Sequence, residues 1–436
     1  MIWLTGLAAP ATYNCQLMKP VFSLYAHIAR AAANRPDRLA LMADGRAWTF
    51  AELAKETTTG QALPAGTPWA TSGSAPELAL AAYRCSAAGR PFLPLPPECA
   101  APSLAGTPPQ TALLISTSGS EGQPRMVALG AAQLDAAAAG ANAALDLQAG
   151  DLWLNCLPLY HIGGQSILWR CARAGAGVLL HDNFPAERIA GDLTSHPVSH
   201  LLLVPAMLAR LLDLGITPPP ALRAVLIGGA ALSRPLYERA SAAGWPLYVS
   251  YGMSETAAMV AVFKPGDGTW HEGLVGRALP GHALRIGATG RIAIRGPQVM
   301  AGYLDGSGVD PEGWLTTGDL GEIDASGGLT VLGRADDMLI SGGRNIHPQE
   351  IESCLAACPG VQDIAVTGLP DPVWGDLVVA LVVGPVGDEA LLAHARQHLP
   401  SAALPRRIRR LERLPRNAAG KLERLALRRI AAGAMA

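Results

Sequence analysis

Residues 113–125 read Leu-Leu-Ile-Ser-Thr-Ser-Gly-Ser-Glu-Gly-Gln-Pro-Arg, an apolar run that passes directly into a loop of hydroxyl groups and glycines. We expect the apolar run to form a buried strand. Glycine lets a backbone approach a ligand closely, and exposed amides and hydroxyls donate hydrogen bonds to an oligophosphate. The loop lacks the Gly-Lys-Ser/Thr ending of the Walker A motif. The stretch therefore predicts a phosphate-binding loop of another type, with an ordinary surface loop as the alternative.

The composition is that of a compact protein with no general affinity for nucleic acid or membranes. The chain has 436 residues, of which 50% are hydrophobic and 16% charged, enough for at least two domains with sizeable cores. Its 34 basic and 35 acidic residues nearly cancel, so a global electrostatic case for nucleic acid or an anionic membrane is excluded. The seven cysteines have no framework spacing, which indicates reduced thiols in the cytoplasm. We expect a small-molecule substrate and leave a homo-oligomer open.

Three local features leave alternatives open. Residues 406–410 carry four arginines and predict either a solvated edge or an anion-binding surface. Cys354 and Cys358 lie one helical turn apart, and without a His or Cys pair beside them they favour two small apolar residues on a helix over a metal site. The chain start lacks the basic region of a signal peptide, and Met18 is an alternative start of translation. No apolar run in the sequence is long enough to cross a bilayer.

The order of apolar runs predicts an α/β fold. Short Leu, Val and Ile runs at 201–204, 224–227 and 247–249 alternate with Ala-rich amphipathic stretches, which is typical of parallel sheets covered by helices. From about residue 273, short β-like pieces separated by glycine indicate an antiparallel, β-rich subdomain. We therefore predict a large N-terminal domain over residues 1–332 and a small, mobile α+β domain over residues 333–436.

Six polar or glycine-rich segments follow one another in a fixed order, beginning with the phosphate loop. The others are residues 157–164, 228–231, 251–256, 317–319 with 333–343, and 415–421. In this order and spacing the set resembles the adenylate-forming superfamily of acyl-CoA synthetases, luciferases and adenylation domains, over roughly residues 20 to 425. The resemblance implies an AMP-forming ligase that uses ATP, Mg²⁺ and coenzyme A.

The resemblance also implies a place for each ATP contact. Attack of a carboxylate on the α-phosphorus brings two anions together, so the site must neutralise charge and align the groups. Glu255 matches the carboxylate that holds Mg²⁺, Tyr251 the ring that stacks on adenine, and Asp319 the ribose acceptor. The implied ATP-binding residues are Thr117, Ser118, Gly119, Ser120, Arg125, Gly229, Ala230, Tyr251, Gly252, Ser254, Asp319 and Arg334. Two residues depart from the pattern, because Arg125 replaces the usual lysine and Glu121 stands where threonine is usual.

A second group of residues is implied to act through movement of the small domain. Lys421 matches a mobile lysine that bridges the carboxylate and the α-phosphate during adenylation. Asp336 matches the hinge about which the small domain rotates between the two half-reactions. Gly343 would leave room for the pantetheine arm of coenzyme A. Trp374 resembles an aromatic contact for coenzyme A, with a tryptophan in the domain core as the alternative.

The segment after His161 carries the clue to the acid. His161 aligns with a gate between the ATP and acyl pockets, with a structural histidine as the alternative. Residues 163–170 and 174–176 resemble the o-succinylbenzoate–CoA ligases of menaquinone biosynthesis, which implies an acyl pocket that includes Arg170, Gly228 and Met253. An Arg170 on the helix surface is the competing interpretation. Alternatives for the function are a ligase for a simple aryl or medium-chain acid, a carrier-protein loading enzyme, and a non-catalytic homologue.

Overall fold

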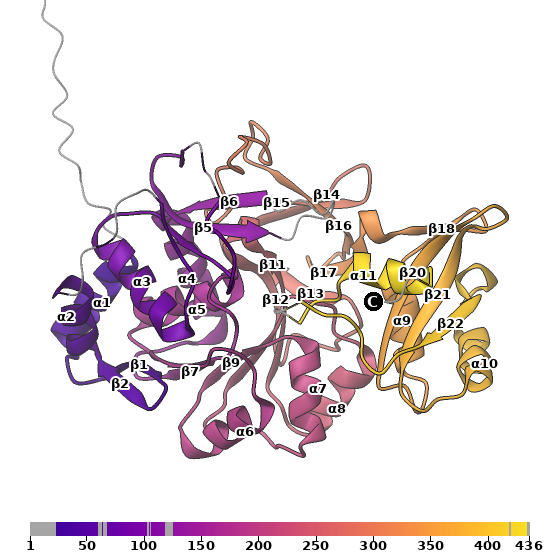
Figure 1. Ribbon diagram of the computed structural model, residues 1–436, viewed down its shortest axis with the longest axis horizontal. Helices are drawn as coiled ribbons and strands as arrows, with labels where there is room; N and C mark the ends of the chain where they lie inside the picture. Colours follow the sequence, from indigo (N-terminus) through magenta and orange to yellow (C-terminus); the bar gives the residue numbers. More distant parts are fainter. Residues whose placement is uncertain are drawn as a thin grey trace, which may run out of the picture.

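The computed structural model describes residues 23–59, 63, 68–102, 104, 106–117, 125–417 and 420–433 (Figure 1). The predicted phosphate-loop residues Ser118, Gly119 and Ser120 lie outside the described residues, as does Glu121. Among the described residues, no helix is both long enough and apolar enough to cross a membrane.

A mixed sheet of 13 strands forms the centre of the large domain. From one edge to the other the strands are β14 (Ala283–Ile286), β15 (Arg291–Arg295), β16 (Leu315–Ile323), β17 (Leu329–Arg334), β13 (Leu274–Ala278), β12 (Ala258–Phe263), β11 (Leu247–Met253), β10 (Ala224–Ile227), β9 (His200–Leu203), β7 (Leu152–Asn155), β8 (Gly177–Leu180), β1 (Leu39–Ala43) and β2 (Arg46–Thr49). The run from β11 to β1 is parallel throughout. Strands β7 to β10 are short apolar runs that are buried at every residue, as expected for parallel strands covered on both faces.

Helices connect the parallel strands and cover the sheet. They are α1 (Leu24–Asn34), α2 (Phe50–Thr59), α3 (Ala75–Ala87), α4 (Ala131–Leu145), α5 (Ile162–Ala174), α6 (Ala186–Ser195), α7 (Pro205–Asp213) and α8 (Arg234–Ala242). Helix α5 is buried along most of its length and packs against α4 and α1. It ends at Gly175, whose φ of 72° is the left-handed conformation that glycine adopts without strain. The predicted α/β class is confirmed.

A smaller sheet of four strands presents the phosphate loop. Its strands are β3 (Trp69–Thr71), β4 (Phe92–Pro94), β5 (Thr111–Thr117) and β6 (Arg125–Gly130). The predicted strand at 113–115 is confirmed as the fully buried centre of β5. Strands β5 and β6 pair antiparallel, with Thr117 opposite Arg125. The two residues that flank the loop are therefore fixed by this pairing.

The antiparallel subdomain predicted from residue 273 is the end of the large sheet from β12 to β14. All its strand pairs are antiparallel. The pairing of β16 with β17 places Asp319 directly opposite Arg334. Two motifs that are separate in the sequence thus become cross-strand neighbours.

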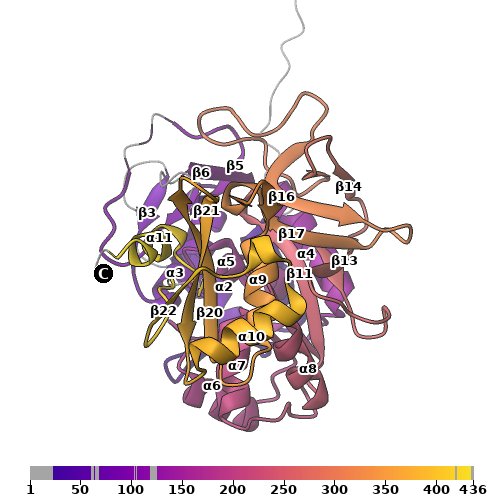
Figure 2. The ribbon, with the colours of Figure 1, turned by 90° about the vertical axis from the view of Figure 1, so that its right-hand side faces the viewer.

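The C-terminal part has its own sheet and its own cores (Figure 2). The sheet contains β19 (Arg344–Ile346), β18 (Leu339–Ser341), β21 (Gly375–Val383), β20 (Asp363–Asp371) and β22 (Arg407–Arg410), with helices α9 (Pro348–Ala356), α10 (Asp388–His398) and α11 (Arg424–Ala431). The last residue of the large core is Leu329 and the first of the small core is Leu339. We therefore keep residue 333 as the proposed start of the small domain.

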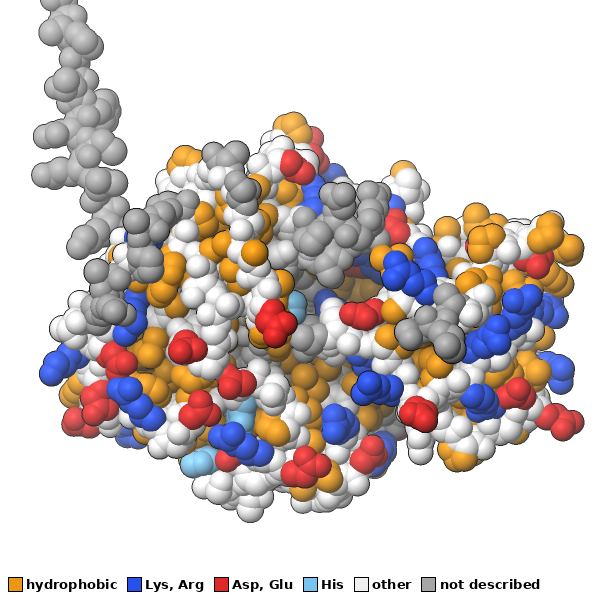
Figure 3. Space-filling view, viewed as in Figure 1, with side chains coloured by type: hydrophobic (Ala, Val, Ile, Leu, Met, Phe, Trp, Pro, Cys, Tyr) orange, Lys and Arg blue, Asp and Glu red, His pale blue; other side chains and the backbone are white. Residues whose placement is uncertain are grey.

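The basic segment at 406–410 forms part of this sheet. Strand β22 pairs parallel with β21, and Arg407, Arg409 and Arg410 are exposed on it. Figure 3 shows Lys and Arg side chains gathered on the small domain at the right of the view. The arginines thus lie on a solvated strand edge, which was one of the two predicted alternatives.

Candidate active site

The adenine and ribose positions of the predicted site lie at the end of β11. Tyr251 is buried, its hydroxyl donates a hydrogen bond of 2.7 Å to Oδ2 of Asp319, and Oγ1 of Thr317 lies 3.5 Å from the hydroxyl oxygen. Nη1 of Arg334 lies 3.6 Å from Oδ1 of Asp319. Burial, with the Asp319 carboxylate beside it, raises the pKa of Tyr251 well above its usual value. The phenol is therefore a neutral donor, and the ring, the carboxylate and the guanidinium form one cluster.

Glu255 is held by a turn that follows β11 directly. Residues Ser254–Thr256 form a 3₁₀ turn after Met253, and the backbone amide of Met253 donates to Oγ1 of Thr256. Gly252 lies two residues before this turn, and a Cβ there would lie 2.0 Å from the carbonyl oxygen of Ala258. The chain can therefore fold back tightly only with glycine at this position.

The carboxylate of Glu255 has a partner that sequence reasoning did not identify. The Tyr303 hydroxyl donates a 2.6 Å hydrogen bond to Oε1 of Glu255. Beneath the turn, the buried amide of Gln298 donates to the carbonyls of Thr256 and Met259. A carboxylate has about four lone-pair positions, so Glu255 keeps capacity for a cation. Tyr303 is the single aromatic residue in the glycine-rich stretch 302–308, and this isolation was the only sequence signal for it.

The residues that flank the phosphate loop point toward the same region. The Arg125 guanidinium lies over the Tyr303 ring, 3.5 Å from its centroid. It also forms a 3.3 Å ion pair with Asp305 and a hydrogen bond to Ser307. Thr117 donates to the backbone carbonyl of Arg125 at 3.1 Å. Arg125 and Glu255 are therefore linked through Tyr303, whose ring face contacts the guanidinium and whose hydroxyl contacts the carboxylate.

The predicted mobile lysine reaches this cluster from the small domain. A Cβ on Gly229 would lie 3.5 Å from Cε of Lys421, and one on Gly420 would lie 2.7 Å from Val204 of the large domain. Gly420 also has a φ of 75°, so the approach of the segment to Val204 requires glycine. Desolvation lowers the pKa of Lys421, and the carboxylates of Asp319 and Glu255 oppose this change. The structure thus places Lys421 between the Gly229 loop and the two carboxylates.

The loop after β10 carries the predicted small residues Gly228, Gly229 and Ala230. Gly228 is packed so that a Cβ would lie 3.0 Å from Oγ of Ser250. Gly229 has a φ of 77° and, with Ala230, is exposed. Of these small residues, Gly229 is the one that faces Lys421, because a Cβ there would lie 3.5 Å from Cε of the lysine.

His161 stands at the N-terminus of α5, where it is the N-cap residue. Its ring packs against Tyr160 with a centroid separation of 4.8 Å. Burial, with the charge of Lys421 nearby, lowers the pKa of His161 from 6.5 to about 4. The imidazole is therefore neutral at physiological pH, and it lies close enough to Lys421 for the ammonium charge to contribute to its lowered pKa.

Arg170 lies inside the protein, so the predicted alternative of a surface arginine is wrong. Its exposed fraction is 2%, and its guanidinium lies over the Trp153 ring at 5.4 Å. Nε and Nη1 have no hydrogen-bond partner, and within the described part of the chain no carboxylate forms an ion pair with it. Burial lowers the pKa of Arg170 to about 10, so it stays charged. A buried cation without a counter-charge is costly unless a ligand supplies one.

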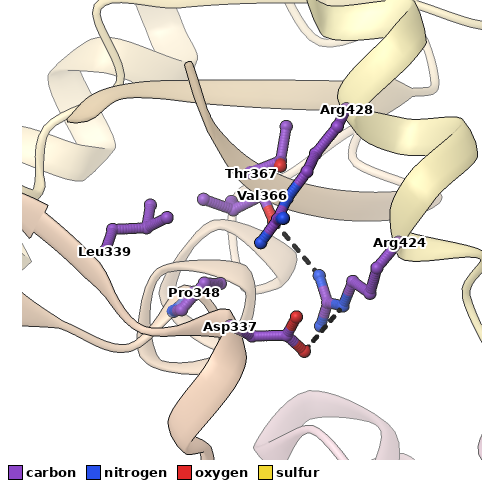
Figure 4. Close-up of a pocket in the computed structure, with 7 residues that line it drawn as sticks. All are labelled: Asp337, Leu339, Pro348, Val366, Thr367, Arg424 and Arg428. Carbon is purple, nitrogen blue, oxygen red and sulfur yellow. Dashed lines mark hydrogen bonds and ion pairs between the residues drawn. The ribbon is translucent and has the colours of Figure 1, made fainter. Parts of the chain in front are cut away.

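The predicted hinge lies where the chain leaves β17. Asp336 sits in a 3₁₀ turn over Ala335–Asp337 and pairs with Arg334 at 3.2 Å and Arg291 at 3.7 Å. The next residue, Asp337, pairs with Arg424 of α11 at 3.4 Å. Figure 4 shows Arg424 reaching from α11 to Asp337 and to the carbonyl of Val366. The helix that follows Lys421 is therefore tied to the residue beside the hinge.

The residues predicted for coenzyme A lie apart from this cluster. The backbone amide of Gly342 donates to the carbonyl of Trp374 at 2.9 Å, and the Arg406 guanidinium lies over the Trp374 ring at 4.2 Å. Gly343 has open space where a Cβ would be. Asp371, Gly342 and Arg406, which contact Trp374, belong to the small domain. Among the described residues, the structure thus brings Tyr251, Asp319, Arg334 and Lys421 together, while Trp374 contacts Gly342 and Arg406 of the small domain.

Comparison with known proteins identifies relatives of this chain. Residues 71–304 match the AMP-binding enzyme family and residues 350–421 match the AMP-binding enzyme C-terminal domain. A 2-succinylbenzoate–CoA ligase of Bacillus cereus is 36% identical over 334 residues, which cover 73% of this chain and 69% of the relative. A corresponding ligase of Bacillus thuringiensis is 37% identical over the same shares.

Solved structures agree with the sequence comparison. The o-succinylbenzoate CoA synthetase of Bacillus subtilis in complex with its acyl-adenylate intermediate has a TM-score of 0.80 and 28% identity, covering 92% of this chain and 97% of that one. The same synthetase with ATP and magnesium ion has a TM-score of 0.79 at 28% identity, covering 92% and 98%. From the ordered motifs, the fold and these matches, the chain belongs to the AMP-binding enzyme family.

Proposed function

We propose that this protein is an AMP-forming acid–CoA ligase that activates 2-succinylbenzoate with ATP and transfers the acyl group to coenzyme A, a step of menaquinone biosynthesis. The observation that carries the choice of acid is Arg170, a buried guanidinium with two unpaired nitrogens. 2-Succinylbenzoate has two carboxylates, and only one is activated. The other would supply the counter-charge that Arg170 lacks. The relatives named for this acid support the same choice.

The ATP-side cluster fits a nucleotide without rearrangement of its hydrogen bonds. The Tyr251 ring offers an apolar face, and Asp319 offers a carboxylate that already accepts from the Tyr251 hydroxyl. Tyr251 lies near the end of β11 and Asp319 in the middle of β16, and the Asp319 carboxylate is close enough to Lys421 to act on its pKa. We assign adenine to Tyr251, the ribose hydroxyls to Asp319 with Arg334, and the phosphates to Thr117, the loop 118–124 and Arg125.

Glu255 is the proposed ligand for Mg²⁺, because a carboxylate oxygen is the donor that this ion prefers. When bound, the ion would neutralise phosphate charge. Tyr303 fixes the carboxylate by its 2.6 Å hydrogen bond. The Arg125 guanidinium also packs on the Tyr303 ring. Tyr303 therefore positions both the cationic side chain and the proposed metal-binding carboxylate. Neither group has to be reorganised when the phosphates enter.

Lys421 is the proposed cation that joins the attacking carboxylate to the α-phosphate. Its ammonium would offset the repulsion between the two anions in the transition state. The neutral His161 next to it would not compete for the anions, and its ring would form a wall between the acyl and nucleotide positions. Gly228 and Met253 are the proposed further residues of the acyl pocket.

We infer that the second half-reaction uses another orientation of the small domain. Lys421 lies beside Gly229 of the large domain, whereas Trp374 packs against Arg406 of its own domain and Gly343 has open space at its Cβ position. A rotation about Asp336 would exchange the two faces, so that Gly343 and Trp374 meet coenzyme A. We also propose a cytoplasmic enzyme, since the six cysteines among the described residues are free thiols.

The proposal is tested by following pyrophosphate and thioester with purified protein. We expect ATP-dependent pyrophosphate release with 2-succinylbenzoate in the absence of coenzyme A, limited to about one turnover, and continuous turnover when coenzyme A is added. Benzoate and hexanoate should react far more slowly. Continuous turnover with either monoacid and none with the diacid would refute the choice of acid. A requirement for a carrier protein in place of coenzyme A would refute the acceptor.

A further inference from the structure

A cluster of metal-ligating side chains lies in the small domain, outside the active site. Cys354 on α9 and His394 and His398 on α10 each offer one ligand atom, and these atoms all lie within 4.8 Å of one another. The two helices pack side by side (Figure 2). In the sequence no His or Cys pair accompanies Cys354 and Cys358. The fold, however, brings His394 to Cys354, from a position 40 residues later in the chain.

The hydrogen bonds of the two imidazoles prepare both rings for ligation. Nε2 of His394 lies 3.0 Å from the carbonyl oxygen of Cys354, and Nδ1 of His398 lies 2.9 Å from the carbonyl oxygen of His394. A carbonyl only accepts, so each of these nitrogens carries the proton and donates. The other nitrogen of each neutral ring, Nδ1 of His394 and Nε2 of His398, then has a free lone pair. A metal-binding histidine ordinarily has this arrangement, with its second nitrogen donating to a carbonyl or carboxylate.

The rings are also held close together. The centroids of His394 and His398 are 4.5 Å apart with an angle of 32° between the planes. Cys354 and His394 are partly buried, whereas His398 is exposed. The cluster is thus anchored on the protein side and open to solvent on the other. Solvent access allows an ion to enter and leaves a position for a water ligand.

The spacing of the ligand atoms suits a small tetrahedral ion after minor side-chain adjustment. With metal–ligand distances of about 2.0 to 2.3 Å, tetrahedral ligand atoms are about 3.3 to 3.8 Å apart. Contraction from within 4.8 Å requires shifts of about 1 Å, which rotation of the cysteine and the exposed His398 can supply. One thiolate and two imidazoles favour Zn²⁺ over the hard ion Mg²⁺.

We propose that Cys354, His394 and His398 form a Zn²⁺ site that ties α9 to α10, with water as the fourth ligand. Binding converts the Cys354 thiol to a thiolate, and the proton passes to solvent. Burial, together with Cys358, Glu350 and Glu272, raises the pKa of Cys354, so the thiol is protonated before the metal arrives. The site is separate from the proposed Mg²⁺ ligand Glu255, which is in the large domain.

The test uses the full chain, stripped of metal by a chelator and free of ATP. Zn²⁺ is titrated against a chromogenic competitor, and Co²⁺ is used as a spectroscopic probe of thiolate ligation. We expect one Zn²⁺ per chain and a thiolate-to-Co²⁺ charge-transfer band. Cys354→Ser should abolish the band and weaken Zn²⁺ binding by at least about 100-fold, since even loss of an outer-shell partner costs about 10- to 100-fold.

His398→Ala provides a second variant whose folding is not at risk, because His398 is exposed. It should weaken Zn²⁺ binding to a similar extent and keep the circular dichroism spectrum of wild type. Cys99→Ser and His271→Ala, which alter an exposed cysteine and an exposed histidine elsewhere, should bind like wild type. Zn²⁺ binding that is unchanged in both Cys354→Ser and His398→Ala, or absent in wild type, would overturn the proposal.

Discussion

Replacement of Arg170 by leucine changes the acid preference of the enzyme and spares its fold, if Arg170 pairs with a substrate carboxylate. Arg170 has an exposed fraction of 2%, and its Nε and Nη1 have no partner. In the substrate-free protein this cation is uncompensated. Leucine removes the buried charge and fills part of the space with apolar atoms. We therefore expect Arg170→Leu to be at least as stable as wild type.

The size of the effect on the diacid follows from the desolvation of the guanidinium. Burial lowers the pKa of Arg170 from 12.5 to about 10. At about 1.4 kcal/mol per pKa unit, the charged form is destabilised by about 3 kcal/mol relative to water. A substrate carboxylate that pairs with the guanidinium offsets this penalty, and loss of such a contact costs about 2 to 4 kcal/mol. The corresponding loss in kcat/KM for 2-succinylbenzoate is about 30- to 1000-fold.

The assay measures kcat/KM for 2-succinylbenzoate and for benzoate by pyrophosphate release, in wild type and variant. Arg173→Leu on the same helix is the matched control. Arg173 already has a counter-charge in Asp135, so its removal should lower stability and leave the ratio of the two kcat/KM values unchanged. For Arg170→Leu the ratio should fall by about 30- to 1000-fold, with benzoate hardly affected. An unchanged ratio, or equal losses for both acids, would refute the reasoning and remove Arg170 from the acyl pocket.

Three further predictions concern the catalytic lysine, the hinge and the buried histidine. Lys421→Ala should slow adenylation by about 100- to 1000-fold and spare attack of coenzyme A on supplied acyl-adenylate, and equal losses in the separately measured half-reactions would contradict the assignment. Asp336→Pro should fix the backbone at the hinge, so that acyl-adenylate forms and thioester does not, whereas normal turnover would place the pivot elsewhere. The pKa of His161 is lowered from 6.5 to about 4 in the folded protein, so as pH falls the unfolded chain binds a proton at this residue before the folded chain does. The stability that the neutral ring contributes is therefore complete above pH 6.5 and is lost as pH falls toward 4. His161→Gln should therefore reduce the fall in unfolding free energy between pH 6.5 and 4 by up to about 3 kcal/mol, measured by urea unfolding, and an unaltered slope would show that another group titrates there.

The sequence predicts well those features that are local. The strand at 113–115 and the alternating α/β order each depend on the pattern of a few neighbouring residues. The site residues that form motifs, such as Tyr251 and Lys421, could be identified because each motif is contiguous. The loop after β10 and the residues at the end of β11 then lie together because these parallel strands end at the same edge of the sheet, whereas Lys421 reaches them from the small domain.

Contacts between distant segments without a motif were not predictable. Tyr303 reaches Glu255 across 48 residues, and Arg424 reaches Glu352 across 72. His394 and Cys354 meet only because α9 and α10 pack together. For Arg170 the sequence pattern predicts a place on a helix but not the direction of the side chain, and a basic residue on a helix faces solvent more often than the interior. Burial with unpaired nitrogens is a property of the tertiary packing alone.

The most direct measurement of the central claim is a competition between acids in a single reaction. Equal concentrations of 2-succinylbenzoate, benzoate and hexanoate are incubated with ATP, Mg²⁺, coenzyme A and wild-type protein, and the thioesters are separated by mass. Because all acids compete for the same enzyme, the product ratio reports the ratio of their kcat/KM values. Our account predicts that the thioester of 2-succinylbenzoate predominates. Predominance of a monoacid thioester, or cleavage of ATP without any thioester, would contradict it.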